Sequence, residues 1–328
     1  MLAFCGCTSL PTADELVEAP GPHLAEDAPP GIVDGRARFR AYFCAESDAC
    51  NRWLHRLPGE QPPQAITDQD RPKLQVFFVT SAFGECFGDN AQPFNTAIRD
   101  LSGGGDRFDT ILVGGRSSTE ENARKIMAWF EDHPADPELP LVLVGYSKGA
   151  VDILQFLVDY PDNAAAVDAV VSVAGAIGGS PLADRFGGLY DFTLSRLPSE
   201  RCEKGDGGVV DSLQTDVRRN WLAEHELPGH IRYYSLAAFT GRDRMARALV
   251  PAWKLLLKHE RRNDGQVLAR DALLPNSTLL GYLNADHWEA AIELEKDLEY
   301  FAGRRDPERL PHTALLAAIL RYVGDDLE

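Results

Sequence analysis

The chain has little positive charge and lacks the long runs that define several classes of protein. It carries 33 Lys and Arg against 50 Asp and Glu, so its formal net charge at pH 7 is −17. Because no extended basic run is present, we expect nucleic acid and anionic membrane surfaces to repel the chain on average. We interpret the acidity as a contribution to solubility rather than as steering of a cationic substrate. No stretch of about 18 apolar residues occurs either, so no membrane-spanning helix is predicted.

Cysteine is scarce, and its spacing excludes one common kind of metal site. The six cysteines are Cys5, Cys7, Cys44, Cys50, Cys86 and Cys202. Because no Cys-x-x-Cys pair is followed by a second pair at zinc-ligand spacing, no structural zinc site is predicted. Two disulfides remain hypotheses. Cys44 and Cys50 are close enough in sequence to close a small loop, and Cys86 could pair with Cys202.

The N-terminal residues resemble the end of a bacterial lipoprotein signal. A short apolar stub leads to Gly6 and Cys7, and a stretch rich in Pro, Ala and Glu follows. The resemblance implies a periplasmic or outer-membrane-anchored lipoprotein attached through a lipid on Cys7. The four later cysteines suit an oxidising compartment. Phe4 is bulky and the stub is short for a full signal, and a cytoplasmic protein with a disordered tail is the alternative.

From residue 36 onward the chain alternates strand-like and helix-like segments. Apolar or alternating runs predict strands at 36–45, 73–83, 108–115, 139–146, 167–176, 231–239 and 277–284. Helical spacing predicts helices at 118–133, 148–160, 287–301 and 312–323. Ser118 and Glu121 fit a capping box at the start of the first helix, and Pro161 ends the second. The alternation is typical of an α/β fold, a mostly parallel sheet with helices on both faces.

The sequence predicts one folded domain at 36–328, preceded by a signal remnant and flexible tether at 1–35. Residues 180–228 interrupt the alternation and are rich in Gly, Asp, Arg and Leu. We expect them to leave the sheet as an insertion. Six apolar residues of this insertion are candidates for the lining of a pocket or for a satellite core under a long loop. They are Phe186, Leu189, Tyr190, Phe192, Leu194 and Leu197.

A lone serine stands between two glycines where a predicted strand turns into a predicted helix, in the segment VGYSKGA (144–150). A Cβ at Gly145 or Gly149 is expected to collide with neighbouring backbone. Ser147 would then be held in a strained conformation above the sheet, over the free N–H groups of a helix N-terminus. This arrangement suits a nucleophile that passes through an anionic adduct. A small-residue turn without chemistry is the alternative.

A serine hydroxyl is a weak nucleophile at neutral pH, so it needs a base and a group that orients the base. In G-x-S-x-G elbows the order along the chain is serine, acid, histidine. His287 follows the last predicted strand, where the base belongs. The other histidines after Ser147 are interpreted as structural or surface residues: His225, His230, His259 and His312.

Three aspartates are candidates for the acid. Asp264 lies in an Asn-Asp-Gly turn, which can present a carboxylate at a loop tip, and precedes His287 by 23 residues. Asp243 follows the preceding strand more closely and is the rival, and Asp271 is a weaker third candidate. We favour Asp264.

An oxyanion hole needs two backbone N–H donors. The first is expected from Lys148, the residue after the nucleophile, with the lysine side chain incidental and solvated. The second is expected from the loop after the strand at 73–83, at Ala82 or Phe83.

Four stretches resemble the bacterial triacylglycerol lipase and esterase branch of the α/β-hydrolases. They are the elbow at 144–150, VVSVAGAIGGSPLAD (170–184), IRYYSLAAFTG (231–241), and NDGQV (263–267) with DHWE (286–289). The resemblance implies the α/β-hydrolase fold, with a cap over the active site. Thr80 and Ser81 replace the usual His-Gly of the oxyanion loop, and Ala176-Ile177-Gly178 stands where the family often has a His-Arg or His-Gly pair. The structural calcium of some relatives is not carried over, because no convincing carboxylate set is present.

These observations predict a serine carboxylic-ester hydrolase with a Ser-His-Asp triad of Ser147, His287 and Asp264. The expected substrate is a small-molecule or lipid ester, and no cofactor or metal is implied. An acyltransferase with the same triad is one alternative, and a non-catalytic binding protein on a hydrolase scaffold is another.

Overall fold

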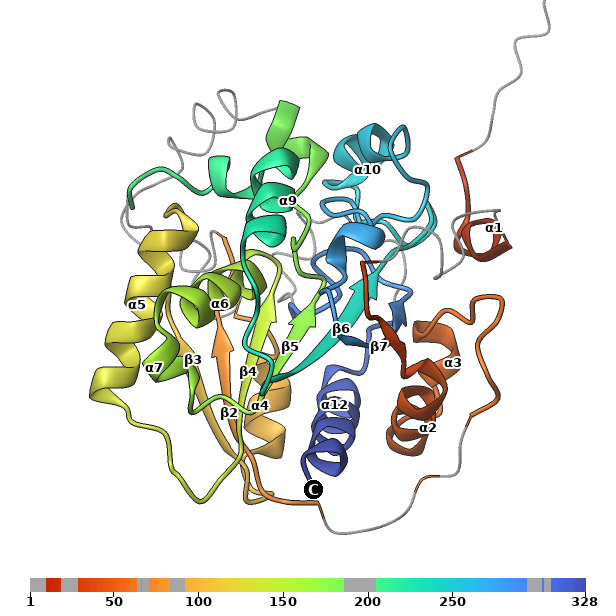
Figure 1. Ribbon diagram of the computed structural model, residues 1–328. Helices are drawn as coiled ribbons and strands as arrows, with labels where there is room; N and C mark the ends of the chain where they lie inside the picture. The colour runs from red at the N-terminus through yellow and green to blue at the C-terminus, as the bar shows by residue number, and fades with distance from the viewer. Residues whose placement is uncertain are drawn as a thin grey trace, which may run out of the picture.

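The described residues form one parallel sheet. The computed structural model describes residues 10–18, 29–63, 66, 71–82, 92–185, 205–293, 303 and 308–328. Within these ranges seven strands pair in the order β1-β7-β6-β5-β4-β2-β3, every pair parallel (Figure 1). The strands are β1 (Val33–Asp34), β2 (Gln75–Val79), β3 (Arg107–Ile111), β4 (Leu141–Tyr146), β5 (Ala169–Val173), β6 (Arg232–Ala238) and β7 (Thr278–Leu283). Six of the seven predicted strands are thereby confirmed.

The strand order reverses at β2. The chain places β3 at one edge of the sheet and then returns, so that β4 pairs with β2 on its other side. In open parallel sheets, ligands bind in the crevice beside such a reversal, at the carboxyl ends of the strands. The loop after β2 and the turn after β4 both leave the sheet at this point.

Helices cover both faces of the sheet. The longer ones are α2 (Arg36–Glu46), α4 (Asn95–Leu101), α5 (Thr119–Asp132), α6 (Lys148–Asp159), α9 (Thr215–Glu224), α10 (Val250–Leu256) and α12 (His312–Leu327). The short ones are α1 (Ala13–Glu18), α3 (Cys50–Trp53), α7 (Pro161–Ala164) and the 3₁₀ turns η3 (Asp211–Leu213) and η4 (Arg270–Ala272). Helices α2, α4 and α12 lie together on one face and α5 and α6 on the other. Helices α9 and α10 lie beyond the carboxyl ends of the strands (Figure 1).

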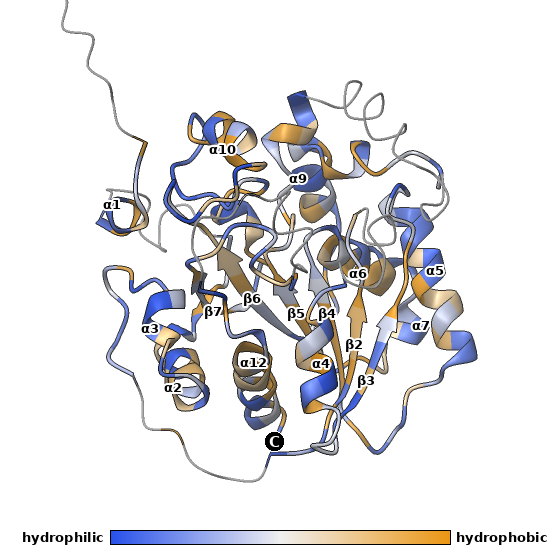
Figure 2. Ribbon diagram, turned by 180° about the vertical axis from the view of Figure 1, so that it is seen from behind, coloured by the Kyte–Doolittle hydropathy of each residue, from blue (hydrophilic) through white to orange (hydrophobic). Residues whose placement is uncertain are grey.

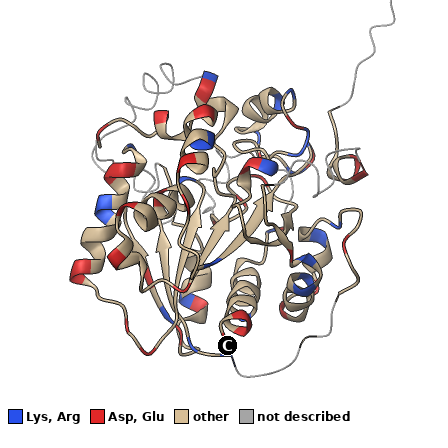
Figure 3. Ribbon diagram, viewed as in Figure 1, with Lys and Arg blue, Asp and Glu red and all other residues tan. Residues whose placement is uncertain are grey.

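Two apolar cores sandwich the sheet because successive strand residues point to opposite faces. In β2, Val76 and Phe78 join the core under α2, α4 and α12, whereas Phe77 and Val79 join the core under α5 and α6. The strands are accordingly coloured mostly as apolar in Figure 2. Charged residues lie mainly on helices and loops (Figure 3). The predicted α/β architecture is confirmed.

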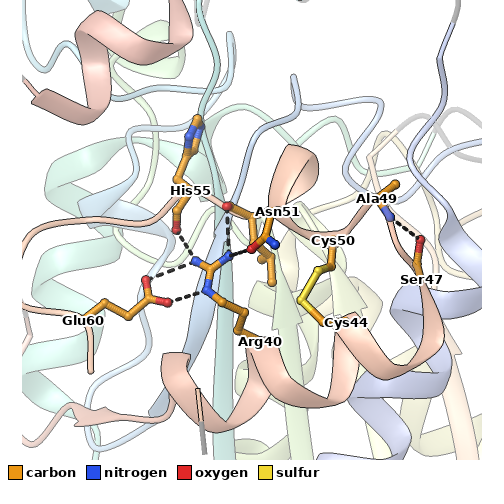
Figure 4. Close-up of a disulfide and its surroundings, with 9 residues drawn as sticks. Arg40, Cys44, Ser47, Ala49, Cys50, Asn51, His55 and Glu60 are labelled. Atoms are coloured by element: carbon orange, nitrogen blue, oxygen red, sulfur yellow. Dashed lines mark hydrogen bonds and ion pairs between the residues drawn. A yellow bond between two sulfur atoms is a disulfide. The ribbon is translucent and has the colours of Figure 1, made fainter. Parts of the chain in front are cut away.

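The prediction of a strand at 36–45 is wrong, because these residues form α2. Phe39 and Phe43 are four residues apart, so on a helix they share one buried face. Helix α2 is joined to α3 by the Cys44–Cys50 disulfide, which confirms that hypothesis (Figure 4). The buried Arg40 guanidinium lies beside the bridge, 2.5 Å from Glu60 Oε1 and 2.8 Å from the His55 carbonyl oxygen. Cys86 and Cys202 lie outside the described residues.

Part of the expected tether packs against the domain. Pro11 accepts a hydrogen bond from the Arg242 backbone N–H at 2.9 Å, and Leu16 of α1 is fully buried. Val33 and Asp34 form β1 and pair with β7. Residues 10–18 and 33–34 are therefore not free linker. Cys7 lies outside the described residues, and the domain boundaries otherwise remain predictions.

The excursion between β5 and β6 leaves the sheet where the insertion is expected. Its described part carries α9, whose first residue Thr215 donates from N and Oγ1 to Asp184, both at 2.7 Å. Asp206 accepts from the Ser118 backbone N–H at 2.7 Å, and Ser180 Oγ donates to the Gln266 carbonyl at 2.5 Å. These hydrogen bonds attach the described part of the insertion to the start of α5 through Ser118 and to the loop at 263–268 through Gln266. The six candidate pocket residues lie outside the described residues.

The remaining helix predictions have mixed outcomes. The helices at 118–133, 148–160 and 312–323 are confirmed as α5, α6 and α12, and Ser118 Oγ caps α5 by accepting from the Glu121 N–H. The helix predicted at 287–301 is wrong for 287–293, where 287–291 form turns and Ile292 forms an isolated bridge with Pro93, and 294–301 lie outside the described residues.

Candidate active site

The turn between β4 and α6 has the geometry of a nucleophile elbow. Ser147 has φ 54° and ψ −123°, a left-handed conformation that non-glycine residues rarely adopt. Backbone hydrogen bonds fix it: its N–H donates to the Val173 carbonyl at 3.1 Å, and its carbonyl accepts from the Ala176 N–H at 3.2 Å. The serine is therefore locked between β5 and the first turn of α6.

Both elbow glycines are required by close backbone contacts. A Cβ on Gly145 would lie 2.4 Å from Ala150 Cα, and one on Gly149 would lie 2.5 Å from the Val79 carbonyl oxygen. Neither contact can be relieved by moving a flexible side chain. The predicted reason for the two glycines is confirmed, and the α6 N-terminus packs directly on the end of β2.

The three predicted triad residues meet. The His287 Nε2 lies 2.8 Å from Ser147 Oγ, and its Nδ1 lies 2.7 Å from Asp264 Oδ2. Ser147 is 7% exposed, and the other two are buried. With Nδ1–H donating to the carboxylate, Nε2 is left as the acceptor for the serine proton. The geometry is that of a nucleophile, its base and the group that orients the base.

The acid is held by a tight loop at 263–268. Asp264 Oδ1 accepts from the backbone N–H groups of Gln266 at 2.8 Å and Val267 at 2.7 Å, which leaves Oδ2 for the imidazole. Gly265 makes the turn with φ +95°. The His287 N–H donates to the Asp264 carbonyl at 2.8 Å, so side chain and backbone are both paired. These fixed donors orient the carboxylate toward the imidazole.

The rival assignments do not reach the site. Asp243 is exposed, and Asp271 accepts from Arg219 of α9. His225, His230 and His312 each bond a main-chain carbonyl, and His259 is exposed. Their interpretation as structural or surface residues agrees with these contacts.

Of the two expected oxyanion donors, the structure describes the Lys148 N–H, but it does not decide between Ala82 and Phe83. Lys148 is the first residue of α6, so its N–H belongs to the free donors of that helix terminus. The hypothetical Cβ of Gly149 lies 2.8 Å from the Thr80 carbonyl, so the loop after β2 adjoins this terminus. Ala82 packs beside the apolar cluster of Ala183, Val209 and Val210 in the insertion. Phe83 lies outside the described residues, and the choice between it and Ala82 stays a prediction.

The expectation of a solvated Lys148 side chain is wrong. It is fully buried, and its Nζ lies 2.5 Å from Asp152 Oδ1, one turn further along α6. Burial raises the pKa of Asp152 to about 6, while the contacts with Lys148 and Asn122 oppose the rise. The i,i+4 spacing was visible in the sequence, but the burial of this face was not.

Tyr146 is a second residue that the sequence reasoning missed. Its hydroxyl donates to the His287 carbonyl at 2.7 Å, and its ring centroid lies 5.1 Å from that of the imidazole. Tyr146 is the last residue of β4 and occupies the variable position before the serine in the G-x-S-x-G motif. From there its hydrogen bond and its ring contact support His287. In the described part of the chain, no group of three or more His, Cys, Asp or Glu could hold a metal ion, and no helix is long and apolar enough to cross a membrane.

Comparison with solved structures finds similar proteins. The metagenomic carboxyl esterase MGS0156 shares 38% sequence identity over 90% of this chain and 93% of its own, with a TM-score of 0.84. The mature form of the Bacillus licheniformis lipase BlEst2 shares 22% identity over 69% of this chain and 90% of its own, with a TM-score of 0.51, and supports the fold. No family model and no curated protein matches the chain.

Proposed function

Because the chain belongs to the α/β-hydrolase esterase and lipase family, we propose that it hydrolyses carboxylic esters through an acyl-enzyme on Ser147. The observation that carries this proposal is the hydrogen-bonded series Ser147–His287–Asp264, with distances of 2.8 and 2.7 Å. A non-catalytic binding protein has no need of this geometry, so the complete triad favours an enzyme. The 38% identical relative is a carboxyl esterase, which supports a small-molecule or lipid carboxylic ester as the substrate of this chain.

The geometry supports a two-stage reaction. His287 Nε2 takes the Ser147 proton as Oγ attacks the ester carbonyl, and the resulting oxyanion faces the N–H of Lys148. The imidazolium, stabilised by Asp264, then gives its proton to the leaving alcohol. In the second stage His287 deprotonates a water molecule, which attacks the acyl-enzyme. The collapse of that intermediate returns the proton to Ser147 and releases the carboxylic acid.

Replacement of the nucleophile tests the proposal. Ser147→Ala should abolish turnover of short p-nitrophenyl esters, because no acyl-enzyme can form, and should abolish labelling by a fluorophosphonate. Exposed Ser102, whose hydroxyl donates to the Ile98 carbonyl one turn earlier in the chain, provides the control variant Ser102→Ala, which should keep wild-type activity. Near-wild-type hydrolysis by Ser147→Ala would refute the assignment.

Export and lipid anchoring through Cys7 form a separate proposal. It is supported by the lipoprotein-like residues before Cys7 and by the Cys44–Cys50 disulfide, since disulfides persist in oxidising compartments. Mass spectrometry of the N-terminal peptide from the native host tests it. A mature chain that begins with acylated Cys7 is expected, and an unmodified Cys7 peptide would contradict it.

A further inference from the structure

A buried charge cluster lies directly behind the nucleophile. Lys148 follows Ser147 in the chain, and both it and Asp152 are 0% exposed. Their 2.5 Å ion pair spans the first turn of α6, whose N-terminus carries the catalytic serine. Ion pairs in such positions are rare, because removing both charges from water is expensive.

The second oxygen of Asp152 ties this turn to the neighbouring helix. Asp152 Oδ2 accepts from Asn122 Nδ2 of α5 at 2.8 Å. Asn122 in turn accepts from the Gly114 N–H at 2.9 Å and donates to the Gly114 carbonyl at 3.1 Å. The first turn of α6 is thus fixed, by hydrogen bonds of defined direction, to α5 and to the loop that follows β3.

A third charged group comes from the insertion. Arg218 of α9 is 1% exposed, and its Nε donates to the Ile177 carbonyl at 3.3 Å. Ile177 follows Ala176, whose N–H holds the Ser147 carbonyl. Burial lowers the pKa of Arg218 to about 10, and Asp152 is the first of the two acids that oppose the fall. Arg218 thus connects α9 to the backbone segment whose Ala176 N–H holds the Ser147 carbonyl.

Stability alone is a weak explanation for this cluster. Apolar residues of similar volume commonly replace a buried ion pair with no loss of stability, and sometimes with a gain. Leucine or methionine, however, cannot reproduce the directional bond to Asn122. What the cluster provides is a single orientation of the α6 terminus relative to α5 and the loop after β3.

We propose that Asp152 is a positioning residue for ester hydrolysis. By pairing with Lys148 and accepting from Asn122, it fixes the backbone of the first turn of α6. The direction of the Lys148 N–H toward the oxyanion and the position of Ser147 depend on that turn. The proposal rests on the proposed function of Ser147. Small displacements of catalytic groups are sufficient to lower turnover about 100-fold.

The test compares Asp152→Asn with a matched control on the same helix. Asp159 also lies on α6, but it is exposed and accepts only from Gln155 among the bonds that the structure gives it, so Asp159→Asn should behave as wild type. For Asp152→Asn, kcat on a p-nitrophenyl ester should fall about 10- to 100-fold, with KM changed less than about twofold. Both parameters are measured well below the melting temperature of each variant.

A second variant keeps the test decisive if Asp152→Asn does not fold. Lys148→Met with Asp152→Leu removes both charges and retains the backbone N–H of residue 148. It should fold with a melting temperature near wild type and still show the reduced kcat. A folded variant of either kind with wild-type kcat would assign the cluster a structural role only and overturn the proposal.

Fluorophosphonate labelling separates this result from a failure of the proposed function. The labelling rate reports the reactivity of Ser147 without any ester substrate, and it should fall in parallel with kcat. If the wild-type protein is labelled but hydrolyses no ester, the proposed function is contradicted, and the labelling rates of the variants still decide the role of Asp152.

Discussion

At Ser147 the local sequence, a strained backbone conformation and the proposed chemistry coincide. Its positive φ costs about 1–3 kcal/mol, and that cost is sustained because strands, helix and two glycines leave the turn no alternative. Such over-determination explains why the nucleophile can be predicted from five residues. The base could be predicted as well, because a parallel sheet brings the end of its last strand to the same edge.

At the residue scale, the choice of acid has a direct test. Asp264→Asn should lower kcat about 10³- to 10⁴-fold, because an amide NH₂ facing Nδ1 selects the tautomer in which Nε2 carries the proton and cannot accept from Ser147. Steady-state kinetics on a p-nitrophenyl ester measure the loss. The exposed rival provides the control, since Asp243→Asn should retain wild-type kcat; the reverse pattern would identify Asp243 as the acid.

The missed residues share a physical cause. The polar character of Lys148 favours solvent in any reading of the sequence, and only the packing of α5, α6 and α9 around it reveals a buried partner. The hydroxyl of Tyr146 was likewise invisible, because its acceptor is a backbone carbonyl 141 residues away. Pairings of this kind depend on tertiary contacts and leave no local pattern.

At the scale of elements, α2 shows how short patterns mislead. The sequence RARFRAYFCA alternates polar and apolar residues as a strand does, yet Phe39, Tyr42 and Phe43 also fit one face of a helix. The structure selects the helix, because these rings pack against α12, where Tyr322 lies 6.3 Å from Phe39 and 6.0 Å from Tyr42 between ring centroids. Tertiary packing therefore decides between two local readings.

The disulfide between α2 and α3 should contribute measurably to stability. Replacing both Cys44 and Cys50 by Ser should lower the free energy of unfolding by about 2 kcal/mol, because the bridge restricts the unfolded chain over a six-residue separation. Denaturant titration measures the loss. Ser47→Ala removes only a side-chain bond to the Ala49 N–H in the same turn and should cost less than about 1 kcal/mol (Figure 4). A double Cys44 and Cys50 variant with the same free energy of unfolding as wild type would show that the bridge does not restrict the unfolded chain.

At the scale of the whole molecule, the sheet decides where chemistry occurs. The alternation of strands and helices predicted the layers, and the reversal of strand order at β2 places the elbow and the loop after β2 side by side. The packing of residues 10–18 was not predictable, because a segment rich in Pro, Ala and Glu has the composition of a linker. In the structure the segment differs from a linker because Pro11, Ala13 and Leu16 are buried against the domain.

Stability of the whole molecule should depend on pH through buried His55. Burial lowers its pKa to about 4 from an ordinary 6.5, so the folded state favours the neutral ring, which stacks on Phe239 at 4.0 Å and donates from Nε2 to the Phe239 carbonyl. A lowered folded pKa gives stability that is present above pH 6.5 and is lost as pH falls toward 4. Between pH 8 and 5 the loss attributable to His55 is about 2 kcal/mol.

The variant His55→Gln isolates this contribution. Free energies of unfolding for wild type and variant are measured at pH 8 and pH 5. The difference between the two proteins should be about 2 kcal/mol smaller at pH 5 than at pH 8. The comparison cancels groups of opposite sign such as Glu260, whose pKa burial raises to about 7. A gap that is equal at the two pH values would show that His55 does not titrate differently on unfolding.

The packing of α1 has a practical meaning for anyone who shortens or tethers the chain. Arg262 donates to the Leu16 carbonyl at 3.1 Å, and Leu16 shares an apolar cluster with Val267, whose N–H supports the Asp264 carboxylate. Trimming at residue 19 would strip the outer layer from the loop that carries the acid. A pull on the N-terminus from a surface or a fusion partner would act on α1, which packs against that loop, so residues 10–18 are better regarded as part of the catalytic domain than as a linker.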